Sequence, residues 1–373
     1  MQYRTLGRTG LKTSILGIGG FHLLEIGDDE AAALLHRYLD AGGNYVETAP
    51  QYGNGESERK VGRVMAERRG ECILATKCNE RERDAAAATF AGSLRRLQTD
   101  HVDALFMHHV QTGEELERIL APDGALRAAE AARDAGQVRF IGISTHGHPQ
   151  LLIRALEAYP FDLIMTGFNF YDRFNFPLTE EKLLPMALER GVGVVGMKVV
   201  GDGFLWRSAE MAFRYAWSLP IHVMVAGMNT PAILEQDIAR AEAFTPMDDA
   251  ERERLFAESP ELGNYVCRLC DKCLPCPEGV DIPRIFTLEG WYDRQMWDGV
   301  VRDPGDFWMR QVLRFWFTNE ERARAAYANM EIRADACTDC GECEPRCPYN
   351  LPIVSKLGHA HYKLTVETAI MGR

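Results

Sequence analysis

The chain has 373 residues, 46% of them hydrophobic and 26% charged, and a formal net charge of −12. This length accommodates a barrel-sized domain and a smaller second domain, and the composition is that of a globular protein. The negative charge argues against a nucleic-acid partner, since phosphate binding needs clustered Lys and Arg, and no apolar run reaches the roughly 18 residues of a membrane-spanning helix.

The first two-thirds of the sequence alternates short apolar runs with helical periodicity, which predicts parallel strands joined by crossover helices. Strands are expected at residues 14–19, 45–48, 72–77, 102–108, 138–144, 162–169, 193–199 and 222–226. Helices are expected at residues 28–41, 57–69, 85–98, a longer stretch that ends at 136, 149–158, 180–190, 209–219 and 232–244. Eight strand–helix pairs over roughly 230 residues predict a (β/α)8 barrel. The alternative, a doubly wound open sheet, would have a glycine-rich phosphate turn after the first strand, which Leu16–Gly20 matches poorly.

Polar side chains gather where the second, third and fourth predicted strands end. Glu47 and Tyr52 follow the second strand, Lys77 ends the third, and His108 ends the fourth. Because all strands of such a barrel end on one face, where the chemistry of this fold occurs, we expect these side chains to meet there.

This set suits the reduction of a carbonyl by hydride, in which the developing alkoxide needs a proton. A phenol has a pKa of about 10, and the neighbouring ammonium of Lys77 is expected to lower that of Tyr52. We expect Glu47 to keep Lys77 charged and His108 to donate a hydrogen bond to the substrate oxygen. Taken singly, the tyrosine, lysine and histidine each have a structural explanation, as a turn residue, a solvated strand end and a core histidine.

The run from Thr48 to Gly53, together with Lys77 and His108, resembles the aldo-keto reductases. Their motif is Asp-Thr-Ala-x-x-Tyr-Gly, with a lysine and a histidine closing the next two strands. The resemblance extends over residues 1–245 and implies a TIM barrel, a nicotinamide cofactor and a catalytic tetrad of Tyr52, Lys77, His108 and an acid. The acid here is Glu47, where the family has aspartate. Its extra methylene either preserves the ion pair with Lys77 or retunes Tyr52.

The resemblance also implies a nicotinamide pocket, which the sequence matches in part. Met165 and Met197 replace a glutamine and the tyrosine that stacks on nicotinamide. Thr230 and Ile233 replace the cations that bind the 2′-phosphate of NADP, which favours NAD, or weakly held NADP, over tightly bound NADP. Loss of nicotinamide binding is the remaining alternative. The helix start after Gly227 suits a phosphate. The expected cofactor-binding residues are Ser144, Thr145, Asn169, Lys198, Gly227, Asn229 and Thr230.

Lys198 is expected either to supply the pocket with a cation or to be a solvated strand end. His146 and His148 are interpreted as surface-loop residues in preference to substrate contacts.

Eight of the ten cysteines form two runs, C-x2-C-x2-C-x2-C-P at residues 267–277 and C-x2-C-x2-C-x3-C-P at residues 337–348. In this layout three thiolates bind corners of one iron–sulfur cubane, and the fourth, followed by proline, can ligate a neighbouring cubane. The runs therefore predict two [4Fe–4S] clusters, with two structural zinc ions or four disulfides as alternatives. The expected ligands are Cys267, Cys270, Cys273, Cys276, Cys337, Cys340, Cys343 and Cys347.

Residues 246–373 are expected to form a separate domain. Residues 246–254 resemble a linker that leads into a short helix, and the insert between the cysteine runs is periodic for helix at 307–317 and 319–329. The residues around Cys276 and Cys347 resemble the α-helical type of two-cluster ferredoxin domain. Aldo-keto reductases fused to such a domain form a subgroup that the whole chain resembles. The expected architecture is a (β/α)8 barrel at residues 1–245, followed by a small, mainly α-helical ferredoxin-like domain.

These features predict an oxidoreductase acting on a small-molecule carbonyl or alcohol, with clusters that carry electrons or serve as structure. A ferredoxin or flavodoxin is the expected redox partner if they carry electrons. The alternatives are an acid/base lyase or isomerase on the same barrel site, and an electron-carrying scaffold with a vestigial barrel. The N-terminus lacks the apolar core of a signal peptide, and thiols need a reducing compartment, so a cytoplasmic protein is expected.

Overall fold

The computed structural model describes residues 1–146, 148–170, 172–201, 205, 208–258, 267, 271–293, 320–347 and 351–365. These residues fall into two compact units. The first comprises Met1–Gly201 and Ser208–Arg252, and the second comprises Leu205 and the described residues from Glu253 onward. Each unit is described separately below.

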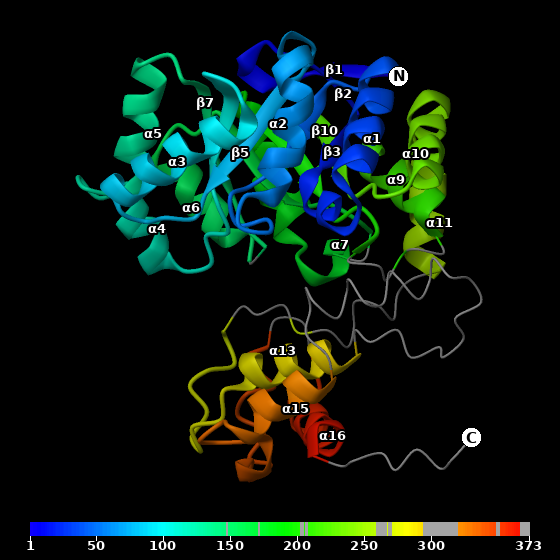
Figure 1. The fold of residues 1–373 in the computed structure, drawn as a ribbon. Coiled ribbons are helices and arrows are strands. Elements are labelled where there is room, and N and C mark those ends of the chain that lie inside the picture. The colour runs from blue at the N-terminus through cyan, green and yellow to red at the C-terminus, as the bar shows by residue number, and fades with distance from the viewer. Residues whose placement is uncertain are drawn as a thin grey trace. The chain divides into compact units, whose positions relative to one another are not determined.

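The first unit is a closed barrel of parallel strands surrounded by helices (Figure 1). The strands are hydrogen-bonded in the order β10-β3-β4-β5-β6-β7-β8-β9, so chain order is kept around the barrel and the last strand closes on the first. The expected (β/α)8 architecture is therefore confirmed. The strands are β3 (Leu16–Gly19), β4 (Tyr45–Glu47), β5 (Ile73–Cys78), β6 (Val102–Met107), β7 (Val138–Ser144), β8 (Leu163–Gly167), β9 (Gly193–Met197) and β10 (Val223–Ala226).

Helices α1 to α9 lie between these strands along the chain, and α10 and α11 follow the last strand. The bounds are α1 (Asp28–Asp40), α2 (Glu56–Arg68), α3 (Arg83–Leu97), α4 (Gly113–Leu120), α5 (Ala125–Asp134), α6 (Gln150–Ala158), α7 (Asp172–Asn175), α8 (Leu184–Glu189), α9 (Ala209–Ser218), α10 (Pro231–Ala243) and α11 (Asp249–Glu258). Every residue of β5 and β6 is buried, as is usual for strands covered on both faces.

The barrel interior is filled by apolar side chains from β4, β5, β6, β8, β9 and β10. Tyr45, Phe106, Met165 and Val223 belong to this core, and Leu6 packs into it from outside the barrel strands. Leu6 lies in the turn of a hairpin formed by β1 (Tyr3–Thr5) and β2 (Lys12–Ser14), which precedes the barrel. It packs near Gly193, where β9 begins, so the hairpin closes the end opposite to the strand C-termini.

Three local expectations differ from the structure. The antiparallel hairpin β1–β2 was not predicted, and the first barrel strand begins at Leu16 and not at residue 14. The expected long helix ending at 136 is two helices, α4 and α5, separated at Gly124. A Cβ at Gly124 would lie 2.3 Å from the carbonyl oxygen of Arg118, so the chain can turn here only because the residue is glycine. The expected helix 180–190 starts as a π-helical turn, Thr179–Leu183, and continues as α8.

The second unit is mainly helical in its described residues. It contains α13 (Ile282–Asp293), α15 (Glu320–Ala328) and α16 (Ile353–Thr365), which contact one another around an apolar core (Figure 1). Leu288, Tyr327 and Leu357 belong to this core, and so do Cys273, Cys343 and Cys347. α15 confirms the helix expected at 319–329, whereas the helix expected at 307–317 lies outside the described residues. Across the part of the chain that the structure describes, no helix combines the length and hydropathy of a membrane span.

Candidate active site

The four residues expected to do chemistry meet at the C-terminal ends of adjacent strands. Glu47 is the last residue of β4, and Tyr52 lies in the turn that leads from β4 to α2. Lys77 lies near the end of β5, and His108 directly follows β6. All four side chains are buried, with between 2% and 7% of their surface exposed.

Lys77 is the centre of this group. Its Nζ contacts the Glu47 carboxylate, donates to the carbonyl oxygen of Thr48 at 3.0 Å, and lies 3.1 Å from the Tyr52 hydroxyl. The longer side chain of Glu47 therefore still reaches the lysine. Burial lowers the pKa of Lys77 well below its ordinary value, and the adjacent carboxylate opposes that shift because it stabilises the ammonium.

Tyr52 is enclosed by rings and by the ammonium. Phe21 packs edge-to-face on it at 5.3 Å between ring centroids, and His108 does so at 6.0 Å. Lys77 Nζ lies 4.7 Å from the ring centroid. Burial raises the pKa of Tyr52, so the lowering expected from the lysine is not found here. The cause is that a phenolate in this dry position would lose its hydration.

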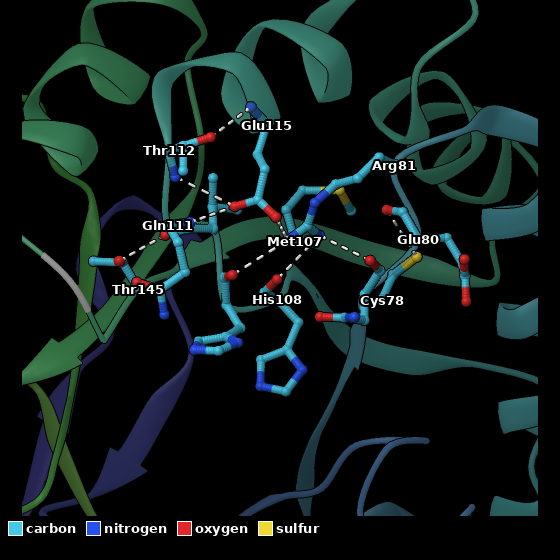
Figure 2. Close-up of polar contacts among 12 residues, drawn as sticks. Cys78, Glu80, Arg81, Met107, His108, Gln111, Thr112, Glu115 and Thr145 are labelled. Atoms are coloured by element: carbon cyan, nitrogen blue, oxygen red, sulfur yellow. Dashed lines mark hydrogen bonds and ion pairs between the residues drawn. The ribbon is translucent and has the colours of Figure 1, made fainter. Parts of the chain in front are cut away.

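His108 is oriented by its surroundings, which favour its neutral form. Its Nδ1 lies 3.3 Å from Gln51 Oε1, and its carbonyl oxygen accepts from Arg81 at 3.1 Å. Burial lowers the pKa of His108 well below its ordinary value, and Lys77, His109 and Arg81 lower it further. Figure 2 shows the Arg81–Glu115 ion pair on the backbone side of His108, with the imidazole ring pointing away from it.

The first part of the expected nicotinamide pocket lies beside His108. Ser144 ends β7, and its hydroxyl donates to the carbonyl oxygen of Met107 at 3.4 Å while accepting from the backbone N–H of His109 at 3.2 Å. The Thr145 hydroxyl donates to the carbonyl oxygen of Val110 at 2.7 Å, and this bond is the dashed line at Thr145 in Figure 2. Ser144 thus keeps one acceptor lone pair. That fits an amide N–H, as in the carboxamide of nicotinamide.

Asn169 and Lys198 lie where β8 and β9 end. The Asn169 amide donates to Asp172 and to the carbonyl oxygen of Lys198, both at 2.9 Å, and accepts from the backbone N–H of Asp172 at 2.7 Å. Asn169 therefore fixes the backbone of Lys198, which is left-handed with a φ of 59°. The positive charge of Lys198 lowers the pKa of both His109 and His146.

The remaining expected residues follow β10. A Cβ on Gly227 would lie 1.9 Å from the His22 ring, so any other residue there would require His22 to move. Asn229 donates to Glu25 at 3.2 Å, and the Glu25 carboxylate lies 3.2 Å from His22 Nδ1. Thr230 caps α10 by accepting from the N–H of Ile233 at 3.2 Å. The start of α10 suits the binding of a phosphate. The Glu25 carboxylate lies beside it and disfavours a second phosphate there.

Several residues of this site were not found from the sequence. Phe21, His22 and Glu25 belong to the 3-10 helix Gly20–Glu25 after β3, Gln51 lies in the turn before Tyr52, and Arg81 follows β5. All of them lie beyond the C-terminal end of a strand, and that position is the one signal that could have found them.

The cysteine runs lie in the second unit, and none of its described cysteines forms a disulfide. Within the described ranges no group of at least three His, Cys, Asp or Glu side chains forms a metal-binding arrangement. Cys270 lies outside them. A charge on Cys276, in the first run, raises the pKa of Cys337 and of Cys343 in the second run. The hydroxyl of Thr338 also donates to Glu278 at 3.3 Å, which joins the two runs.

Both runs turn in the same way. Asp271 and Gly341 each follow the second cysteine of a run, and both are left-handed, with φ values of 60° and 73°. The carbonyl oxygen of each accepts a hydrogen bond from the backbone N–H three residues later. The donor is Leu274 at 3.0 Å in the first run and Glu344 at 3.2 Å in the second. The two runs therefore share a local backbone geometry, which suits ligands of the same kind.

A closed (β/α)8 barrel with a lysine, a tyrosine, a histidine and an acid at its C-terminal mouth defines the class of a barrel oxidoreductase. The model of the Aldo/keto reductase family matches residues 15–215. The chain therefore belongs to the aldo/keto reductase family and is an oxidoreductase of that type. Members of this family use NAD(P), and they act on small molecules.

Individual relatives agree with this assignment. L-galactose dehydrogenase of Arabidopsis thaliana is 30% identical over 222 residues, which cover 55% of this chain and 67% of that protein. D-threo-aldose 1-dehydrogenase of a Pseudomonas species is 30% identical over 234 residues, covering 53% and 69%. The holo form of the Bacillus halodurans aldo-keto reductase AKR11C1 superposes with a TM-score of 0.59 at 25% identity, covering 70% of this chain and 96% of that one.

Proposed function

We propose that the barrel interconverts a carbonyl compound and the corresponding alcohol, with Tyr52, Lys77, His108 and Glu47 as its catalytic residues. The observation that carries this proposal is the position of Lys77, in contact with Glu47 and 3.1 Å from the Tyr52 hydroxyl. An acid held in a buried site beside a cation is suited to protonate an alkoxide.

Each residue has a defined part in this reaction. The nicotinamide, when bound, supplies or accepts the hydride. Tyr52 gives its proton to the substrate oxygen as negative charge develops there, and Lys77 stabilises the phenolate that results. Glu47 holds Lys77 in place. Burial disfavours a positive charge on His108, so its ring can lie at the substrate oxygen without a second cation beside Lys77.

NAD(H) fits this chain better than NADP(H). Glu25 and Asn229 lie beside the start of α10, where a phosphate would lie. The carboxylate disfavours an additional phosphate, whereas it can accept hydrogen bonds from ribose hydroxyls. Ser144, Thr145 and Asn169 supply polar groups at the ends of β7 and β8, and Gly227 and Thr230 supply backbone N–H groups near α10.

The reaction is tested with the full chain, purified under anaerobic conditions, and a panel of aldehydes and ketones. Oxidation of NADH that depends on the carbonyl compound, with the alcohol as product, supports the proposal. Conversion of a substrate without any use of NADH or NADPH would instead identify the acid/base lyase or isomerase, which the same side chains could also serve.

For the second unit, from Glu253 onward, we propose a ferredoxin-like domain that holds two [4Fe–4S] clusters. Cys337, Cys340, Cys343 and Cys276 would ligate one cluster. Cys267, Cys270, Cys273 and Cys347 would ligate the other. The matching turns of the two runs, and the action of Cys276 on Cys337 and Cys343, support this assignment.

Such clusters would supply single-electron transfer or structural support. A ferredoxin or a flavodoxin is the redox partner that suits the first role. The thiols of the two runs, with the free thiols of Cys72 and Cys78, suit a reducing compartment such as the cytoplasm.

A further inference from the structure

A second group of basic side chains lies beside the catalytic residues at the barrel mouth. His109 follows His108 after β6, His146 lies after the end of β7, and Lys198 follows β9. The imidazoles of His109 and His146 pack edge-to-face with 5.1 Å between ring centroids. His109 and His146 therefore come together from two strands, and the charge of Lys198, which follows a third strand, acts on both.

This group is continuous with the reaction centre. His109 lies 6.0 Å from His108 between ring centroids, and His108 lies 6.0 Å from Tyr52. A substrate whose carbonyl oxygen lies at Tyr52 and His108 would therefore extend past His109.

The backbone at two of these residues is held in an uncommon conformation. His109 and Lys198 are left-handed, with φ values of 53° and 59°, which costs non-glycine residues free energy. At His109 the N–H donates to the Ser144 hydroxyl at 3.2 Å, and the carbonyl oxygen accepts from Arg81 at 3.2 Å.

At Lys198 the carbonyl oxygen accepts from Asn169 at 2.9 Å and from the backbone N–H of Gly201 at 2.8 Å. These hydrogen bonds hold both backbones in place, so the points from which the two side chains project are set by the fold.

Most of the described groups that act on His146 and His109 are basic. Burial lowers the pKa of His146 well below its ordinary value, and Lys198, His109, His108 and Lys77 all lower it further. The negative charge of Glu115 raises the pKa of His109. Its carboxylate, however, already accepts hydrogen bonds from Arg81 at 3.1 Å and from the N–H of Gln111 at 2.6 Å. Groups that disfavour one another's positive charge in this way favour an added anion.

We propose that Lys198, His109 and His146 form a subsite for an oxyanion, a carboxylate or a phosphate, carried by the carbonyl substrate. This inference rests on the proposed function, because it places the carbonyl of the same molecule at Tyr52. It names the substrate class as carbonyl or alcohol compounds that bear an acidic group.

The test compares charged and neutral substrates of equal length. The carboxylate arm uses aldehyde acids of increasing chain length, from glyoxylate to adipate semialdehyde, each against its methyl ester. The phosphate arm uses glyceraldehyde 3-phosphate against glyceraldehyde. Both kcat/KM in the unmodified full-length protein and the Kd in a Tyr52→Phe variant, by isothermal titration calorimetry, are measured. The calorimetric arm does not depend on turnover.

We expect at least one acid to be preferred over its neutral partner by about 10-fold or more, the size of a charge-assisted hydrogen bond. Lys198→Met should abolish the preference, and His146→Phe should reduce it. The control Lys182→Met removes an exposed lysine of the π-helical turn and should retain it. The arm that shows the preference identifies the anion.

The proposal is overturned if acids and neutral partners bind equally in both arms, or if the preference survives Lys198→Met. It is also overturned if that variant weakens NADH and all substrates alike, which would assign the lysine to the cofactor. An acid preference in binding without any turnover by the unmodified protein would instead contradict the proposed reaction and leave the anion subsite standing.

Discussion

Lys77 Nζ lies 3.1 Å from the hydroxyl of Tyr52 in a position where both side chains are buried. This relationship joins the acid of the proposed reaction to the group that stabilises its conjugate base. Burial alone disfavours the charged form of each residue. The Glu47 carboxylate offsets this cost for the Lys77 ammonium, which in turn stabilises the phenolate of Tyr52 as it forms. Proton transfer is therefore expected to be coupled to the arrival of the substrate.

Glu47 should be needed for its charge, whereas its length should matter little. Glu47→Gln removes the carboxylate that contacts Lys77 and leaves a buried ammonium without its partner. We expect kcat/KM to fall at least about 10-fold, with a loss of about 3–5 kcal/mol in the free energy of unfolding. Glu47→Asp should retain activity within a few-fold. Equal activity of the glutamine variant and the unmodified protein would remove Glu47 from the site.

NADH should bind more tightly than NADPH. The carboxylate of Glu25, held beside Asn229, repels an additional phosphate, so we expect the Kd for NADH to be lower by about 10-fold. Glu25→Gln should narrow this gap, whereas Glu67→Gln, which changes an exposed glutamate of α2, should not. Fluorescence titration measures both Kd values. Tighter binding of NADPH by the unmodified protein would contradict the role given to Glu25.

The fourth cysteine of each run should ligate the cluster that the other run binds. Anaerobically purified protein is expected to contain about eight irons per chain, and Cys276→Ser should lower this to about four. The same loss is expected for Cys347→Ser, but not for the control Cys72→Ser, which removes a buried thiol of the barrel unit. Iron analysis and electron paramagnetic resonance measure the result. Full iron content in both run variants would show that these cysteines hold no cluster.

Asp237 should make stability depend on pH. Burial raises the pKa of this carboxyl to about 6, although Arg240 pairs with it at 2.5 Å. Its unfolded value is about 3.9. The native state therefore holds the proton more tightly, and this stabilisation is lost as the pH rises from about 4 to about 6. Relative to Asp237→Asn, the free energy of unfolding should fall by up to about 3 kcal/mol over that range in urea denaturation. Parallel curves for the two proteins would contradict the raised pKa.

The sequence predicted those parts of the site that depend on strand ends. Tyr52, Lys77 and His108 could be expected to meet because parallel strands of a barrel end on one face. Gln51, Phe21 and Arg81 could not, since their positions depend on the conformation of loops and turns. The hairpin β1–β2 was missed because strands of three residues carry too little periodicity.

The protonation behaviour was also beyond sequence reasoning. The expected lowering of the Tyr52 pKa considered the charge of Lys77 alone, but the structure shows that burial acts in the opposite direction. In the same way, the basic character of His109 and His146 became significant only when their rings were found 5.1 Å apart.

The central claim is that the Tyr52 hydroxyl delivers the proton. The most direct measurement is kcat for Tyr52→Phe, compared with Tyr45→Phe, which makes the same change at a buried hydroxyl with no hydrogen-bond partner among the described residues. We predict that Tyr52→Phe lowers kcat by about 10²–10⁴ while NADH still binds, and that Tyr45→Phe leaves kcat unchanged. Full activity of Tyr52→Phe would contradict the account.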